Sequence, residues 1–396
     1  MSIYFKAPNL FLCACKVPLM RFLHPRHGMS ATLLAIVSVI FLAGGCSTGK
    51  SAYKHGDYYQ AVLTSVQHLR SSPDHKKSKE ILGLSYQAAV DYLETDAQNQ
   101  LASNANFKYK AVVGNYERIN HLYNEIRTSP GALKVIPNPV NRFKELTDYK
   151  TKAAEESYEA GIQAMMLNTR VDAKNAYFYF TDANGFAPGY RECIEMMDQA
   201  KANATINVIV EPALDNRYSW NFDPIVFGYN SNLFVKFYTP RQAEETGVKR
   251  VDQFLKISVN SYSEGLPQIS RRVENRTDSV KTGEKTVNGQ KVPVYQRISA
   301  STTIFEKKVN SHGSINLWIT DASSKADIRN QEITSDMSWS DSWAIYTGDV
   351  RALASGNKKL VEKREPNMGA GYLQGITKKD LDTRLANMIA SYYGQF

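Results

Sequence analysis

Cysteine is scarce in this sequence. The 396 residues hold only four cysteines, at positions 13, 15, 46 and 193. Four scattered cysteines give no dense disulfide framework of the kind that stabilises small secreted domains. The chain must therefore fold around a hydrophobic core, and at about 100–200 residues per domain its length favours two domains.

Metal-binding motifs are absent as well. The sequence contains no HExxH zinc motif and no C-x-x-C pair. His68 and His75 are close in sequence, but Pro73 lies between them, and a metal site would need further ligands. We therefore expect a protein that is not an enzyme and that holds no metal or cofactor.

Long hydrophobic runs are also rare. The one extended apolar run, Ala31–Ala43, is shorter than the ~20 residues that a membrane-spanning helix needs. It follows basic residues and precedes two glycines, Gly44 and Gly45, which is the order of a secretory signal peptide. Residues 1–45 are therefore predicted to be a signal segment. The stretch before the run is long, so translation from Met20 is an alternative start.

The LAGGCS stretch that closes this segment resembles the lipobox of bacterial lipoproteins. The resemblance implies that the Gly45–Cys46 bond is cleaved and that Cys46 is acylated. Two or three acyl chains anchor a protein firmly, whereas one chain binds only marginally. By the same resemblance, Ser47 in place of Asp favours the outer membrane. The sequence leaves open which face of that membrane the protein occupies.

The net charge of +9 gives little support for nucleic-acid binding. The signal segment contributes four basic residues, Lys6, Lys16, Arg21 and Arg26, and no acidic residue. The basic excess of the remaining chain is small and spread thinly, without the clustered patch that nucleic acids require. We expect no nucleic-acid partner.

Residues 46–205 have the periodicity of helices. The stretch 56–73, GDYYQAVLTSVQHLRSSP, resembles the second helix of a tetratricopeptide repeat, and ILGLSY after it resembles the start of the next repeat. A second copy falls at 164–188, although Val171 replaces the glycine of its inter-helix turn. In this pattern, small residues let two helices approach and proline ends a helix. The matching positions are Gly56, Tyr58, Ala61, Pro73, Leu82, Gly83, Tyr86, Ala176, Phe180, Ala183 and Pro188.

This half is thus expected to be an array of five to seven helices that ends near Thr205. In relatives of the repeat, the concave surface of such an array binds peptides or proteins. A rigid spacer that holds the second domain away from the membrane is the alternative. Cys193 lies among apolar helix positions, so we expect its thiol to be buried and inert.

Residues 206–396 are rich in the β-branched and aromatic runs that are typical of strands. They predict five or more strands in a mainly antiparallel sheet with one solvated face. Two hairpins are expected, one at Asn288–Gly289 and one within KKVNSHGSINLW at 307–318. The chain then returns to helix, with a start near Thr377 and Asp380. The helix face expected to pack on the sheet carries Leu381, Leu385, Met388 and Tyr392.

Trp339, Trp343 and Tyr346 are the most distinctive residues of the second half, at four- and three-residue steps. Two interpretations are open. Exposed aromatic rings could stack on a sugar or peptide ligand. Alternatively, the three rings could form a buried cluster that closes the core.

Together these features predict an α+β protein. Its parts are a signal segment over 1–45, a tetratricopeptide-like helical domain over 46–205, and a mainly antiparallel β domain with a C-terminal helix over 206–396. The expected function is that of a protein anchored to the outer membrane through acylated Cys46. It would serve as a protein-binding scaffold or accessory subunit in outer-membrane or surface assembly. The alternative is a glycan- or peptide-binding lipoprotein that uses the aromatic cluster.

Overall fold

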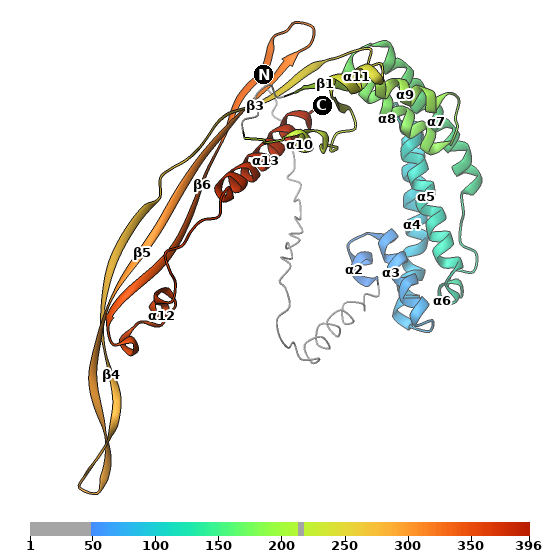
Figure 1. The fold of residues 1–396 in the computed structure, drawn as a ribbon. Helices are drawn as coiled ribbons and strands as arrows, with labels where there is room; N and C mark the ends of the chain where they lie inside the picture. Colours follow the sequence, from blue (N-terminus) through green and yellow to red (C-terminus); the bar gives the residue numbers. More distant parts are fainter. Residues whose placement is uncertain (1–48, 213–217) are drawn as a thin grey trace, which may run out of the picture. The chain divides into compact units, whose positions relative to one another are not determined.

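The computed structural model describes residues 49–212 and 218–396 (Figure 1). It shows N-terminal helices, then a mixed and mostly antiparallel sheet, then a C-terminal helix packed on that sheet, which confirms the predicted α+β class. The signal segment, Met20 and Cys46 lie outside the described residues. The described chain divides into two compact units, one that ends at Lys150 and one that covers Thr151–Phe396.

The first unit is helical. Its core is formed by buried apolar residues of three long helices, packed against the short segment after the third of them. The Asp57 carboxylate caps the first long helix by accepting a hydrogen bond from the Gln60 N–H at 3.0 Å. The helices of this unit are α2 (Lys50–Lys54), α3 (Tyr58–Ser71), α4 (Lys76–Ala102), α5 (Lys108–Arg127), α6 (Pro130–Leu133) and the first turns of α7 (Phe143–Met166).

The second unit begins with the rest of α7, followed by α8 (Arg170–Phe186) and α9 (Cys193–Ala204). Phe180 of α8 is fully buried and lies directly against Gly161 of α7. The described residues before β1 thus hold eight helices, one more than the upper end of the predicted range: six of twelve residues or more and two shorter ones, α2 and α6.

The sheet has six strands. A short parallel part, in the order β2, β1, β3, joins a long antiparallel part in which β5 is central. There β5 pairs with β3 and then β4 along one side, and with β6 along the other. The strands are β1 (Ile206–Glu211), β2 (Val235–Tyr238), β3 (Gln253–Glu264), β4 (Gln268–Val287), β5 (Gln290–Asp321) and β6 (Asp327–Gly348).

One of the two predicted hairpins is confirmed and the other is wrong. Asn288 and Gly289 have φ values of 51° and 79° and form the two-residue turn between β4 and β5. The second expected turn, around Gly313, is instead the interior of β5, which runs unbroken for 32 residues. Gly313 is needed there for close packing, because a Cβ atom on it would lie 2.7 Å from the Thr377 side chain of the C-terminal helix.

That helix, α13 (Tyr372–Tyr393), starts five residues before the predicted Thr377. Thr377 is not a cap but a buried residue whose hydroxyl lies 2.8 Å from the hydroxyl of Ser311 on β5. The predicted face is otherwise correct, since Leu381 and Leu385 are fully buried and Met388 packs at the edge of the core. Figure 1 shows α13 lying along the sheet.

Two further features shape the far end of the sheet. Because β6 ends opposite Ala300, residues 277–299 of β4 and β5 continue as an exposed two-stranded ribbon (Figure 1). At about 3.3 Å per residue, each arm of this ribbon extends for roughly 35 Å. A 3₁₀ turn (Val350–Ala352) and α12 (Ser355–Val361) fold back onto the base of the ribbon, where Leu353 packs against Ile298. Two short helices, α10 (Asp223–Phe227) and α11 (Pro240–Glu245), flank the parallel strands.

Candidate functional site

The part of the sheet where β4, β5 and β6 run together presents side chains on two faces. Between Ala300 and Lys308, each β5 residue has a partner on both sides. Successive side chains of a strand alternate between faces, so the odd-numbered residues here share the face on which α13 packs at Ser311. That face carries Phe305 between Arg271 and Trp343, and Thr303 between Val273 and Ile345.

Five apolar residues lie near one another on this face, with Arg271 and Thr303 among them, and we call them the sheet patch: Ile269, Val273, Phe305, Trp343 and Ile345. Phe305 and Trp343 are half-buried, and their rings stack with centroids 5.2 Å apart and an interplanar angle of 16°. The aliphatic members are exposed, Val273 by 59% and Ile345 by 60%. Contiguous exposed apolar surface is uncommon on soluble proteins and marks interaction sites.

Charged groups border one end of the sheet patch. Lys307 donates to Glu365 at 2.7 Å, and Lys363 donates to Asp341 at 2.8 Å. The hydrogen bond from Lys363, together with the Ser342 N–H, holds the pKa of Asp341 below its usual value. These bonds fix the chain after α12 along the rim, so the site combines an apolar centre with a polar border, as protein interfaces do.

The structure separates the three aromatic residues singled out in the sequence. Trp339 and Trp343 lie on the face of the sheet patch and are both half-buried. Tyr346 lies on the opposite face and is 40% exposed. Steps of four and three residues bring side chains together on a helix, but on a strand an odd step places them on opposite faces. The three rings therefore do not form one platform.

The remaining members of the sheet patch were missed because they lie far apart in sequence. Phe305 meets Trp343 only through the pairing of β5 with β6, and Val273 joins them only through the pairing of β4 with β5. A one-residue change in either register would move these side chains to the other face. The alternation of apolar and polar residues was the one available signal, and it cannot fix a register by itself.

The positions that resemble a repeat are divided between the core and the surface. Most of those expected at helix contacts are buried, but Gly83 of the first-helix pattern is exposed on α4 and Tyr58 is half-buried. The residues expected at helix starts and ends, Gly56, Pro73 and Pro188, are exposed. Cys193 is fully buried, and burial raises the pKa of its thiol. The buried repeat positions are Ala61, Leu82, Tyr86, Ala176, Phe180 and Ala183.

His68 and His75 do meet, with ring centroids 4.3 Å apart. The His75 ring also accepts a hydrogen bond from the Ser78 N–H and so caps α4. Within residues 49–212 and 218–396, no group of three or more potential metal ligands is present. The capping bond gives His75 a structural role at the start of α4.

Residues 44–51, GGCSTGKS, fit the letters of a phosphate-binding loop, and within them GCSTG fits those of a nucleophile elbow. Both motifs require a strand before the loop and a helix after it. The helix that follows, α2, has only five residues, and residues 44–48 lie outside the described part of the chain.

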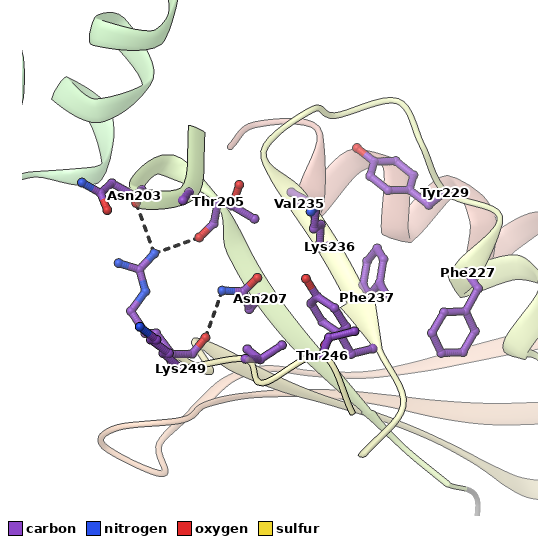
Figure 2. Close-up of a pocket in the computed structure, with 14 residues that line it drawn as sticks. Asn203, Thr205, Asn207, Phe227, Tyr229, Val235, Lys236, Phe237, Thr246 and Lys249 are labelled. Carbon is purple, nitrogen blue, oxygen red and sulfur yellow. Dashed lines mark hydrogen bonds between the residues drawn. The ribbon is translucent and has the colours of Figure 1, made fainter. Parts of the chain in front are cut away.

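A concavity of about 800 Å³ lies beside the parallel strands β1 and β2 (Figure 2). Its polar groups already bond to one another: Arg250 donates to the carbonyl oxygens of Asn203 and Thr205, and Asn207 donates to the Arg250 carbonyl. Lys236 and Lys249 add positive charge at its exposed surface. Its lining holds no carboxylate and no paired nucleophile and base. These hydrogen bonds connect the end of α9 and strand β1 to the segment around Arg250.

Further polar contacts involve Asn207 and Arg250, two residues that line this pocket. The Asp252 carboxylate accepts hydrogen bonds from Arg170 of α8 at 2.6 Å and from the Asn207 N–H of β1 at 2.9 Å. Arg250 also lies 3.1 Å from it. These bonds connect the start of α8 to the first strand of the sheet, within the second unit.

The comparisons with known proteins add no relative: no family model matches this chain, and no curated protein matches it. In the described part of the chain, none of the helices combines the length and the apolar character needed to cross a membrane.

Proposed function

We propose that this protein is a bacterial lipoprotein, anchored at the outer membrane through Cys46, that binds a protein partner through the sheet patch. The observation that carries this proposal is the exposure of Val273 and Ile345 beside the stacked pair of Phe305 and Trp343. A partner that covers these four side chains would remove apolar surface from water at about 25 cal/mol per Å².

The anchor is supported by the sequence alone. A short apolar run, two glycines and then Cys46 have the order of a lipobox, and the only cysteine in the described residues, Cys193, is buried. The helical half supports a scaffold, because most helix-contact positions of the tetratricopeptide-like pattern are buried as that repeat requires. In this proposal the protein is an accessory subunit of envelope assembly rather than an enzyme.

The aromatic alternative has weaker support. Sugar binding usually needs a free ring face, whereas one face of Trp343 is occupied by Phe305. Tyr346 lies on the other side of the sheet from Trp343. An interface with a protein uses the same aromatic and aliphatic surface without a free ring face.

The binding site is tested by removing its exposed apolar groups. We expect the double variant Val273→Thr, Ile345→Thr to lose a stoichiometric partner that co-purifies with the wild-type protein from detergent-solubilised, cross-linked membranes. Threonine keeps the β-branched shape that strands favour, so the melting temperature should change little.

The matched control is Leu266→Thr, Ile328→Thr, which alters exposed apolar residues that are not members of the sheet patch. This control should retain the partner. Equal recovery with both double variants, or with neither, would show that the sheet patch is not the binding site.

The anchor has its own test. Cys46→Ala should abolish incorporation of a labelled fatty acid and shift the protein from the membrane fraction to the soluble fraction. Cys193→Ala is the control and should leave both unchanged, since its thiol is buried. Continued acylation of the Cys46→Ala protein would refute the lipoprotein assignment.

A further inference from the structure

Two long strands bound the antiparallel part of the sheet, and both have an open edge. β4 and β6 each pair only with β5, over 20 and 22 residues. Within the residues that the structure describes, the outward backbone groups of these strands bond to no other backbone group. Edge strands of this length readily pair with a further strand.

The two edges carry opposite charge. β4 has five basic and three acidic residues, whereas β6 has four acidic residues and one basic residue. Between Met337 and Tyr346, β6 holds a single charged side chain, Asp341, and no proline. Charge and proline are the usual protection of an edge, and both are sparse in this stretch, although α12 packs on β6 and Lys363 bonds to Asp341 there.

We propose that copies of this protein assemble edge to edge, with β4 of one copy lying parallel to β6 of the next. Pairing of β4 with β4, or of β6 with β6, would bring like charges together, which disfavours a symmetric dimer. Pairing of unlike edges leaves a free β4 and a free β6 at the two ends of the assembly. Such a contact generates a ring or a filament.

The charges also select a register. When each β4 residue lies beside the β6 residue numbered sixty higher, Arg272 faces Glu332 and Arg276 faces Asp336. No two like charges face each other in that alignment. An even offset also keeps α13 of successive copies on the same face of the joined sheet.

Several of these side chains already have partners within the chain: Lys363 donates to Asp341 at 2.8 Å, Asp336 pairs with His312 at 2.8 Å, and Asn260 donates to Glu332 at 3.2 Å. Arg272 and Arg276 make exposed ion pairs within β4, at 3.1 Å to Glu274 and 3.5 Å to Asp278. Exposed ion pairs contribute little to stability, so the charges can re-pair across the new contact. Backbone hydrogen bonds between the strands supply the affinity, and the charges select the edge and the register. This inference does not rest on the partner proposed above.

The register is tested by disulfide cross-linking of the full-length protein in membranes. We choose Ser270→Cys with Asn330→Cys, which are neutral, exposed and opposite each other at an offset of sixty. Within one copy, Ser270 pairs with Glu306 of β5 and Asn330 pairs with Trp318 of β5. These β5 residues are twelve positions apart, or roughly 40 Å, which is too far for an intrachain disulfide. We expect a ladder of cross-linked dimers and larger species on oxidation.

The control pair, Ser270→Cys with Ser338→Cys, is eight residues out of register and should cross-link many-fold less. Reversing the β4 charges in the in-register variant, with Arg272→Glu and Arg276→Glu, should abolish its ladder. Further reversal on β6, with Glu332→Arg and Asp336→Arg, should restore it, which also shows that the reversed strands still fold. Absence of the ladder, an equal ladder in the control pair, or a ladder that ignores charge reversal would each overturn the proposal.

Discussion

At the scale of single residues, packing in the second unit depends on glycines that admit a large neighbour. A Cβ atom on Gly161 would lie 2.6 Å from the Phe180 ring, which is fully buried. Small residues at such points let α7 and α8 approach closely, as the repeat-like pattern of this segment implies. The match over 164–188 stops short of Gly161, so the sequence identified one side of this contact only.

We expect Gly161→Ala to destabilise the protein by about 1–3 kcal/mol, because the added methyl group overpacks the contact with Phe180. Thermal unfolding followed by circular dichroism measures this change. Gly185→Ala is the matched control: it lies in α8 with open space around its Cα, and alanine should there be neutral or slightly stabilising. Equal melting temperatures for the two variants would contradict the packing argument.

At the scale of secondary-structure elements, the segment from Asp349 to Glu365 is held to the sheet by carboxylates. Within the segment, the Asp349 carboxylate accepts from Arg351 at its start, which lowers the pKa of Asp349 to about 2. Hydrogen bonds from Asn357 and Arg272 lower the pKa of Glu274, and Lys363 does the same for Asp341. A lowered pKa means that the folded state favours the ionised form of each group.

Docking of α12 should therefore be strongest above about pH 4.5 and should weaken as the pH falls through the lowered pKa values, since each carboxylate then gains a proton that its native contacts disfavour. Amide hydrogen exchange over residues 350–361, corrected for intrinsic rates, is expected to show lower protection at pH 3 than at pH 6. Glu274→Gln should reduce this difference. Protection that is unchanged or higher at pH 3 would contradict the account.

The sequence predicted the type of most elements but not all of their pairings. The change from helix to strand after Ala204, the Asn288–Gly289 turn and the packing face of α13 follow from local patterns. The course of β5 through Gly313 does not follow from a local pattern. Gly313 is required by its close packing against Thr377, which is distant in sequence. For the same reason the sheet patch was predicted only in part, through Trp343.

At the scale of the whole molecule, the N-terminal segment, the helical half and the sheet have separate proposed roles. The lipobox would fix the chain to the membrane, the helical half would provide a scaffold, and the sheet would offer one face to a partner and two edges to further copies. The face and the edges use different groups: side chains of the sheet patch in one case, and outward backbone groups of β4 and β6 in the other.

In the proposed function, a different protein covers the sheet patch. The most direct measurement is cross-linking in intact cells with a photoreactive phenylalanine analogue in place of Phe305, which lies on the central strand away from both edges. We predict a discrete adduct with a second protein, and no such adduct when the analogue replaces Tyr346 on the opposite face. No adduct at position 305, an adduct with this chain alone, or the same adduct from both faces would contradict the claim.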